Sequence, residues 1–385
     1  MLKSCPPQRV LQNVKSRTLR AASPNPNHTC RRHQSTKSCP PQVIFSGIQP
    51  TGIPHLGNYL GALQNWVRLQ EKAEKSTKLF YSVVDLHAIT VAQKKEELRR
   101  WKRESLATLL AIGLDPERST VFFQSSVAAH AELMWILSCT ASMGYLSRMT
   151  QWKSKLSLQD DASPLDGGNK SKLKLGLFSY PVLQAADILV HRATHVPVGE
   201  DQTQHLEFAR ECVTNFNHAY GTHLIEPRTI LSPTKRIMSL QSPTQKMSKS
   251  HLSPLSRILL TDSPDTVTKK ISSALTDSQN SVSYSPSERP GVANLLTLWS
   301  SFDTQTPKRT VAQIAEECVV KSLSLKDLKR ETADAVNAGL EPIRRGYERV
   351  LGDEGYVEEV ARRGGLKARE NAEETMVKVR EAVGF

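Results

Sequence analysis

Two glycine- and lysine-rich segments contain the residue types that could handle a polyphosphate. The first, SGIQPTGIPHLGNYLGAL (46–63), follows a short apolar run. Glycines such as Gly47, Gly52 and Gly57 allow backbone N–H groups to approach an anion closely. A helical pattern begins near Asn58, and the positive end of its dipole would point at the same place. The segment predicts a phosphate or nucleotide cradle, although an ordinary tight turn uses the same residues and neither a P-loop nor a dinucleotide motif is present.

The second segment, QKMSKSH (245–251), places Lys246 and Lys249 three residues apart, with serines beside them. Two lysines on a loop can reach a polyphosphate as it becomes a leaving group, where negative charge grows. Taken alone, the segment is more typical of a solvated basic turn on the surface.

A third group of polar residues lies in the apolar segment FSYPVLQAADILV (178–190). Tyr180, Gln184 and Asp187 recur at the spacing of one helix face. An aspartate on an otherwise apolar face is costly to bury unless it has a hydrogen-bond partner. The pattern predicts a polar site on this helix, or else an Asp187 that faces solvent or caps a backbone group.

The elements that must position these segments alternate between strand and helix. The runs that predict strands are VIFS (43–46), KLFYSVVD (78–85), TVFFQ (120–124) and HVPVG (195–199). The helical patterns between and after them cover 58–73, 96–112, 128–143, 178–190 and 200–216. This alternation predicts an α/β, Rossmann-like parallel sheet with crossover connections. The glycine-rich segment would then follow the first strand, where open α/β sheets bind nucleotides.

Three regions are predicted along the chain. Residues 1–42 contain no Asp or Glu, and the first acidic residue is Glu71. Eight lysines and arginines there contribute to the net charge of +13, so the polyanionic partner that this charge suggests needs other support. The composition predicts an organelle-targeting peptide, or alternatively a basic tail that touches nucleic acid. Residues 43–260 form the predicted α/β domain, and 261–385 a C-terminal domain that is all helical.

The cysteines and the apolar runs limit the class of protein further. Cys139, Cys212 and Cys318 lie far apart and no C-x-x-C pair occurs, which argues against a zinc site or a disulfide framework and favours buried, reduced thiols. No stretch approaches the roughly twenty apolar residues that a membrane span needs, so no membrane partner is expected.

Considered together, the motifs resemble those of a known family. PHLGN (54–58), a variant of the HIGH signature, and KMSKS (246–250) occur in the order found in class I aminoacyl-tRNA synthetases. From Val43 onward the chain is similar to the tryptophanyl-tRNA synthetases. The segments that carry this similarity are SGIQPTG (46–52), DLHAIT (85–90), YPVLQAADIL (180–189), VPVGEDQTQH (196–205) and RIMSL (236–240). The basic leader resembles that of the mitochondrial members, which implies the mitochondrial matrix.

The sequence departs from the family pattern at three places. Asn58 stands where the HIGH signature ends in histidine, and Gln184 where bacterial relatives often carry methionine. The insertion around 163–171 is longer than in compact bacterial forms, which leaves the roles of Lys153 and Lys155 open.

The resemblance implies a reaction in two steps. Tryptophan attacks the α-phosphate of ATP to give tryptophanyl-adenylate and pyrophosphate, and tRNA(Trp) then takes the tryptophanyl group. Alignment and charge stabilisation suffice for such chemistry, in agreement with the absence of a Ser-His-Asp or Cys-His arrangement. Mg²⁺ would arrive with ATP, because the sequence shows no carboxylate cage for it. A homodimer and an anticodon-binding role for 261–385 are also implied.

The resemblance also implies roles for individual residues. The expected catalytic residues are His55, Asn58, Lys246 and Lys249. The expected ATP-binding residues are Gln49, Gly57, Asn58, Gly199, Asp201, Gln202, Met238, Lys246, Met247, Ser248 and Lys249. The expected tryptophan-binding residues are Phe45, His87, Tyr180, Gln184, Asp187, Val196 and Val198, with an indole N–H as the partner of Asp187. No protein-held metal site is expected.

Two alternative functions remain open at this point. A tyrosyl-tRNA synthetase of the same subclass also uses Tyr, Gln and Asp on this helix, there to bind a phenol. A non-catalytic RNA-binding paralogue could share the basic charge and the helical domain, although intact PHLGN and KMSKS argue against it. Glu200 and Asp201 could also simply complement the dipole of the helix that follows them.

Overall fold

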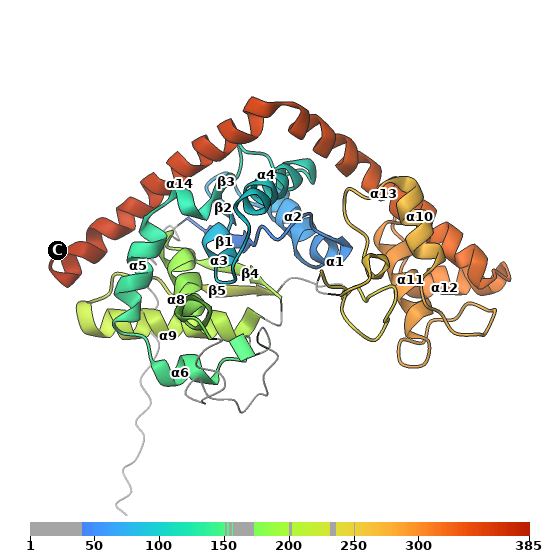
Figure 1. Ribbon diagram of the computed structural model, residues 1–385, viewed down its shortest axis with the longest axis horizontal. Coiled ribbons are helices and arrows are strands. Elements are labelled where there is room, and N and C mark those ends of the chain that lie inside the picture. Colours follow the sequence, from blue (N-terminus) through green and yellow to red (C-terminus); the bar gives the residue numbers. More distant parts are fainter. Residues whose placement is uncertain are drawn as a thin grey trace, which may run out of the picture. The chain divides into compact units, whose positions relative to one another are not determined.

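The computed structural model describes residues 41–385, apart from 151, 154–155, 157–172, 200–201, 232–235 and 250 (Figure 1). These described residues belong to one compact unit. The predicted leader lies outside the described residues except for its last two positions, and so does the predicted insertion around 163–171.

The centre of the fold is a parallel sheet of five strands in the order β3-β2-β1-β4-β5. The strands are β1 (Val43–Ile48), β2 (Lys78–Val83), β3 (Thr120–Phe123), β4 (His195–Val198) and β5 (Arg228–Leu231). The predicted α/β parallel sheet is thereby confirmed. The sequence did not predict β5, a strand of four residues, RTIL, on the edge of the sheet beside β4.

Helices connect and follow the strands. Between β1 and β5 they are α1 (Leu56–Asn58), α2 (Gln64–Lys72), α3 (Asp85–Ala88), α4 (Lys95–Ala111), α5 (Ala129–Ser138), α6 (Met143–Arg148), α8 (Leu175–Val190) and α9 (Thr203–Tyr220). A π-helical turn (Tyr59–Leu63) joins α1 to α2, and a 3₁₀ turn, η2 (Gln124–Ser126), follows β3. After β5 they are α10 (Pro264–Ser272), α11 (Pro290–Ser301), α12 (Val311–Val320), α13 (Leu325–Gly352) and α14 (Glu354–Val383).

The helix predicted over 128–143 is wrong in its C-terminal part. The chain leaves α5 after Ser138, and α6 begins after Ser142, whose hydroxyl caps it by accepting from Tyr145 N–H. The polar run between them supplies a capping residue and little apolar surface, which favours a break over a continuous helix. Cys139 follows the end of α5 and is exposed, whereas Cys212 and Cys318 are buried as predicted.

The two faces of the sheet carry separate hydrophobic cores. Alternate residues of the strands point to opposite faces, so Ile44 and Val121 join the core of α2, α4 and the C-terminal helices α10–α13. Phe45 and Phe122 join the other core, which contains α5, α8, α9 and the C-terminal half of α14. Both faces are therefore covered, as a parallel sheet requires.

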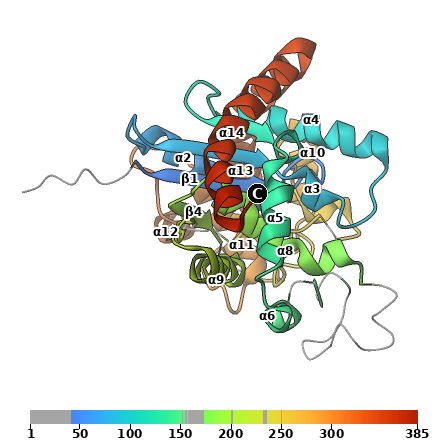
Figure 2. The ribbon, with the colours of Figure 1, turned by 90° about the vertical axis from the view of Figure 1, so that its left-hand side faces the viewer.

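The last helix returns to the sheet. Within the described residues, the chain beyond Ser263 is helical and contains no strand. α13 packs on α4, α10 and α11, whereas α14 runs along the edge strand β3 and reaches α5 and α8 (Figures 1 and 2). Gly364 makes the contact with β3 possible, since a Cβ there would lie 1.9 Å from the carbonyl oxygen of Val121.

Gly364→Ala should destabilise the protein although alanine is the better helix former. The alanine gains about 1 kcal/mol of helix propensity, but its Cβ collides with backbone that must shift, at a cost of about 1–3 kcal/mol or more. Gly355→Ala, in the same helix but with only ordinary contacts, is the matched control and should be neutral or slightly stabilising. Urea midpoints measure both variants, and equal midpoints would contradict the packing of α14 on β3.

Candidate active site

The loop after β1 is held by a pair of residues that cap each other. Asn58 Oδ1 accepts from the backbone N–H of His55 at 3.1 Å, and His55 Nδ1 accepts from that of Asn58 at 3.3 Å. His55 must therefore carry its proton on Nε2 when neutral, and Asn58 keeps its amide NH₂. Gly57 allows this arrangement, because a Cβ there would lie 3.0 Å from the His55 ring. The other polar groups of the pair, His55 Nε2–H and the amide NH₂ of Asn58, are hydrogen-bond donors, and an anion can accept from both.

The lysine-containing loop lies directly against the glycine-rich loop. Lys249 Nζ donates to the carbonyl oxygens of Thr51 at 3.1 Å and Gly52 at 2.7 Å. The chain after this loop also pairs with the glycine-rich loop, since Leu56 N–H donates to Ile258 and Leu260 N–H to Pro54. Two segments that are distant in the sequence are thus joined by backbone and side-chain bonds.

Segment 236–240 fixes the start of the lysine-containing loop. Met238 and Lys246 form an antiparallel bridge, and the N–H of the buried Met247 donates to Ile237 at 3.0 Å. The side chain of Asn294, on α11, clamps the backbone of Met238 by accepting from its N–H and donating to its carbonyl, both at 3.0 Å. The helix α11 therefore supports the loop that carries Lys246 and Lys249.

These groups create a strongly positive environment. Burial first, and then the charges of Lys249, Arg257 and Lys246, lower the pKa of His55 to about 4. Burial, followed by the charge of Arg257, lowers the pKa of Lys249 to about 8, which Glu104 partly opposes. Because each positive charge here makes the others less favourable, an anion bound between them would stabilise all of the charged forms.

A second polar cluster surrounds Asp187 on α8. The fully buried carboxylate accepts from His87 Nε2 at 2.9 Å through Oδ2, and from Gln124 Nε2 at 2.6 Å and His130 Nδ1 at 2.7 Å through Oδ1. The three donors come from α3, η2 and α5. Burial acts to raise the pKa of Asp187, but the hydrogen bonds from His130 and His87 outweigh it and hold the pKa below its usual value. The carboxylate is therefore ionised.

The other predicted residues of α8 belong to a neighbouring chain of hydrogen bonds. Tyr180 and His205 Nε2 are 2.9 Å apart, and His205 Nδ1 and Gln184 Nε2 lie 3.2 and 3.4 Å from Gln202 Oε1. Because an amide oxygen only accepts, His205 Nδ1 donates and its Nε2 accepts from the hydroxyl of Tyr180. Burial raises the pKa of Tyr180, which keeps that hydroxyl protonated.

The remaining predicted residues border these two clusters or lie elsewhere. Phe45, Val196 and Val198 are buried in the core that contains α8, and the carbonyl of Gly199 accepts from Gln202 N–H at 3.0 Å. Gln49 and Ser248 are half-buried on the two loops described above. Asp201 and its neighbour Glu200 lie outside the described residues, as do Lys155 and Ser250. Lys153 is buried beside the ring of Trp152.

Sequence reasoning missed several residues of these clusters. They are Gln124, His130, His191, His205, Arg257 and Asn294. Position gave a signal for one of them, since Gln124 is the last residue of a predicted strand, at the sheet edge where ligands bind. Asn294 gave none, because its partner is the backbone of a segment far away in the chain.

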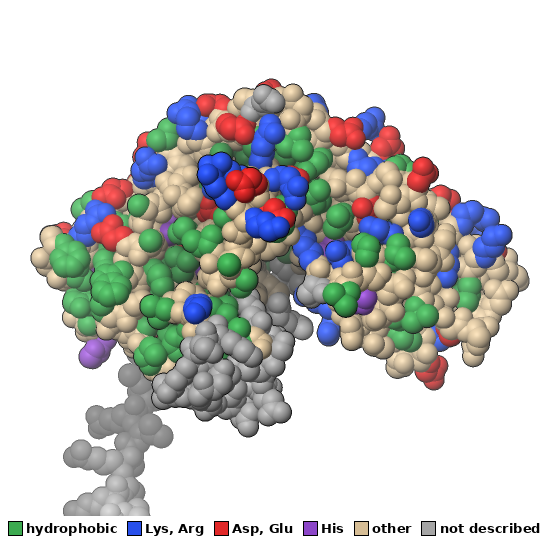
Figure 3. Space-filling model, in the orientation of Figure 1, with side chains coloured by type: hydrophobic (Ala, Val, Ile, Leu, Met, Phe, Trp, Pro, Cys, Tyr) green, Lys and Arg blue, Asp and Glu red, His purple; other side chains and the backbone are tan. Residues whose placement is uncertain are grey.

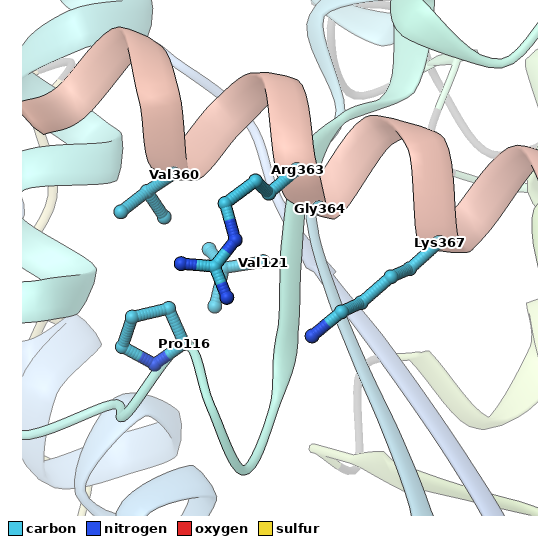
Figure 4. A pocket seen from close by; sticks show the side chains of 6 residues that line it. All are labelled: Pro116, Val121, Val360, Arg363, Gly364 and Lys367. Carbon is cyan, nitrogen blue, oxygen red and sulfur yellow. The ribbon is translucent and has the colours of Figure 1, made fainter.

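Two further observations bear on ligands. Between β3 and α14, a hollow of about 10 Å³ is lined by Pro116, Val121, Val360, Arg363, Gly364 and Lys367 (Figure 4). It has room for about one water molecule, and Arg363 is paired with Glu117 at 2.6 Å. In the part of the chain that the structure describes, no cluster of His, Cys, Asp and Glu could hold a metal ion, and no helix is long and apolar enough to cross a membrane.

Comparisons with known proteins agree with these motifs. The model of the class I tRNA synthetases for tryptophan and tyrosine matches residues 37–341. The mitochondrial tryptophan–tRNA ligase of Schizosaccharomyces pombe is 44% identical over 357 residues, which cover 91% of this chain and 97% of that protein. The one from Saccharomyces cerevisiae is 41% identical, covering 89% of this chain and 91% of that protein.

Solved structures give the same result. The tryptophanyl-tRNA synthetase of Mycoplasma pneumoniae superposes with a TM-score of 0.77 at 32% identity, over 89% of this chain and 98% of that one. The enzyme of Campylobacter jejuni, solved in complex with ADP and tryptophan, has a TM-score of 0.73 at 30% identity, over 89% of this chain and all of that one. These matches agree with the two sequence-distant loops that meet in one cationic site, and this chain belongs to the class I tRNA synthetases, in the tryptophanyl branch.

Proposed function

We propose that this chain activates L-tryptophan with ATP to give tryptophanyl-adenylate and pyrophosphate. It then transfers tryptophan to the ribose of the 3′-terminal adenosine of tRNA(Trp). The observation that carries this proposal is the contact of Lys249 with the glycine-rich loop at Gly52, because it joins the two motif segments in one cationic site. The names of the relatives support tryptophan as the amino acid.

In the first step, the cationic site binds the phosphates of ATP. His55 Nε2–H and the amide of Asn58 donate to phosphate oxygens, with Gln49 and Gly57 beside them. Lys246, Ser248 and Lys249 meet the pyrophosphate as it leaves. Gly199, Asp201 and Gln202 border the ribose, and Met238 and Met247 the rest of the nucleotide. Mg²⁺ arrives with ATP, bound mainly by its phosphates.

Charge on Lys249 should be needed for adenylate formation. With a pKa of about 8, Lys249 is cationic below pH 8 and loses its charge above it. The kcat/KM for ATP, which reports the free enzyme, should therefore fall as the pH rises through 8. Lys249→Arg should abolish this fall, because a guanidinium keeps its charge.

Lys249→Ala should slow adenylate formation in a single turnover by about 10²-fold, as expected for one preorganised charge at a growing anion. Lys72→Ala, which removes an exposed lysine from α2, is the control and should leave the rate unchanged. A Lys249→Ala rate near that of the wild type, or an alkaline fall that survives in Lys249→Arg, would refute the role.

For the amino acid, Asp187 accepts the indole N–H of tryptophan. Each carboxylate oxygen has two acceptor positions, and among the described residues Oδ2 accepts only from His87. One position on Oδ2 is therefore left for a substrate donor. Phe45, His87, Tyr180, Gln184, Val196 and Val198 line the rest of the amino-acid site.

The C-terminal helices, within 261–385, bind the anticodon stem-loop of the tRNA, and residues 43–260 form the catalytic domain. The support is the row of cationic side chains on α13, although they differ in what they contact. Lys326, Arg330 and Arg345 are exposed. Lys329 donates to the carbonyls of Ser272 and Ala274, and Arg344 to that of Asp262, so these two tie α13 to its surroundings.

Charge reversal of Lys326, Arg330 or Arg345 should raise the KM for tRNA, flatten its salt dependence by about one unit of slope per lost phosphate contact and spare adenylate formation. Lys329→Ala is the contrast: it should lower the thermal midpoint, because it removes two hydrogen bonds within the fold. Titration of aminoacylation against tRNA and salt measures the difference. Equal loss of both half-reactions in the reversal variants would mean that this surface only maintains the fold.

Two finer points complete the proposal. The acid-free residues 1–42 direct the chain to the mitochondrial matrix, supported by their composition and by the mitochondrial relatives.

The chain acts as a homodimer, supported by the exposed Trp135 and Met143 and by hydrophobic side chains that gather over the region of α5 (Figure 3). The mass in solution, measured by light scattering, tests the second point.

A further inference from the structure

A continuous line of polar side chains connects the C-terminal helix to Asp187. The Oδ1 atom of Asn371, on α14, lies 3.0 Å from Nδ1 of His191. His191 Nε2 lies 3.4 Å from His130 Nε2, and His130 Nδ1 donates to Asp187 Oδ1 at 2.7 Å. His130 and His191 are fully buried. The function proposed above for Asp187 uses neither His191 nor Asn371.

The hydrogen bonds of this line determine which nitrogens of His191 and His130 are protonated. His191 is neutral, since burial lowers its pKa to about 3. Because Asn371 Oδ1 only accepts, the single proton of His191 lies on Nδ1, and its Nε2 is an acceptor. His130 therefore donates from both nitrogens, through Nε2 to His191 and through Nδ1 to Asp187.

Without this line, the buried Nε2–H of His130 would have no acceptor among the described residues. An unsatisfied buried donor costs free energy, so the ring would turn away from its bond with Asp187 to regain a partner. Holding an imidazole through its second nitrogen is a common way of orienting the group on its other side.

The position of His191 is itself tightly fixed. Its ring stacks on Phe80 with the centroids 4.6 Å apart and on Phe45 at 5.6 Å, and Phe122 meets it edge-on at 5.6 Å. The ring therefore cannot turn to find another partner for Nδ1. Its correct pairing depends on Asn371.

The helix that carries Asn371 is held in place on both sides of this residue. Arg380 binds the carboxylate of Glu132, on α5, through Nε at 2.6 Å and Nη2 at 2.7 Å. Arg369 donates to the carbonyl of Ser126 at 3.0 Å, in the turn that also supplies Gln124. α14 is thus bound to the same elements that surround Asp187.

We propose that Asn371 and His191 are positioning residues for amino-acid selection. They supply the acceptor for His130 Nε2–H and hold its ring in place, and thereby orient the carboxylate of Asp187 toward the substrate. This inference rests on the proposed role of Asp187 as the acceptor for the indole N–H. It makes a residue of the last helix, far from the glycine- and lysine-rich loops in the sequence, part of tryptophan recognition.

The test compares tryptophan with 3-benzothienylalanine, in which sulfur replaces the indole N–H. The readout is the ratio of kcat/KM for the two amino acids in ATP–pyrophosphate exchange. His191→Phe keeps the aromatic stack and removes both nitrogens, and Asn371→Leu removes the hydrogen bond at similar volume. Each should lower the ratio about fivefold, the effect of one neutral hydrogen bond, and leave the KM for ATP unchanged.

Two further variants serve as matched controls. Thr375→Val lies one turn further along the buried side of α14, where the threonine hydroxyl has no partner among the described residues, and should keep the wild-type ratio. Asn371→Asp keeps an acceptor oxygen for His191 Nδ1–H and should retain most of the ratio. Thermal midpoints of all variants show whether each one is folded.

The outcomes distinguish the inference from the function on which it rests. Asp187→Asn should lower the ratio more than any other variant, and if it does not, the proposed role of Asp187 is wrong. If Asp187→Asn lowers the ratio but His191→Phe and Asn371→Leu reduce both substrates equally, the line of residues only maintains the fold and the inference is overturned. The same conclusion follows if Asn371→Asp behaves like Asn371→Leu.

Discussion

The buried carboxylate of Asp187 is the constraint on which the arrangement around the sheet depends. An ionised carboxylate away from water is tolerated only when several donors replace the hydration that it loses. Here the donors are His87, Gln124 and His130, from three elements that are distant in the sequence. Any shift of α3, η2 or α5 would leave part of the charge unpaired, so the requirement for pairing also fixes where these elements lie. A site with such partners is rigid before any substrate arrives.

The cationic site has the opposite character. Instead of a paired charge, it contains Lys246, Lys249 and Arg257 near a neutral His55. Burial first, and then the nearby positive charges, lower the pKa values of His55 and Lys249. The loops that carry these groups are joined by backbone bonds and supported from α11 by Asn294. α11 supports this site and α14 the surroundings of Asp187, so the C-terminal helices contribute to both.

Much of the fold could be predicted from local patterns. The first four strands and the helices between them follow from apolar periodicity, and the glycine-rich loop follows the first strand as expected. Non-local contacts could not be predicted in this way. The return of α14 depends on Gly364 meeting Val121, and the line from Asn371 to Asp187 joins residues that no spacing rule connects. Phe45 and Asp187 were selected from the sequence, but His191 was not. The His191 ring stacks on Phe45 and is connected to Asp187 through His130. The roles of the site residues stay predictions.

The central claim is that this site activates tryptophan rather than tyrosine, the other amino acid handled by the family. The most direct measurement is ATP–pyrophosphate exchange by the purified wild-type protein with each amino acid supplied alone. Because a site that hydrogen-bonds its substrate discriminates strongly against analogues that cannot pair with it, kcat/KM for tryptophan should exceed that for tyrosine by about a hundredfold or more. Comparable values for the two amino acids, or exchange with tyrosine alone, would contradict the account.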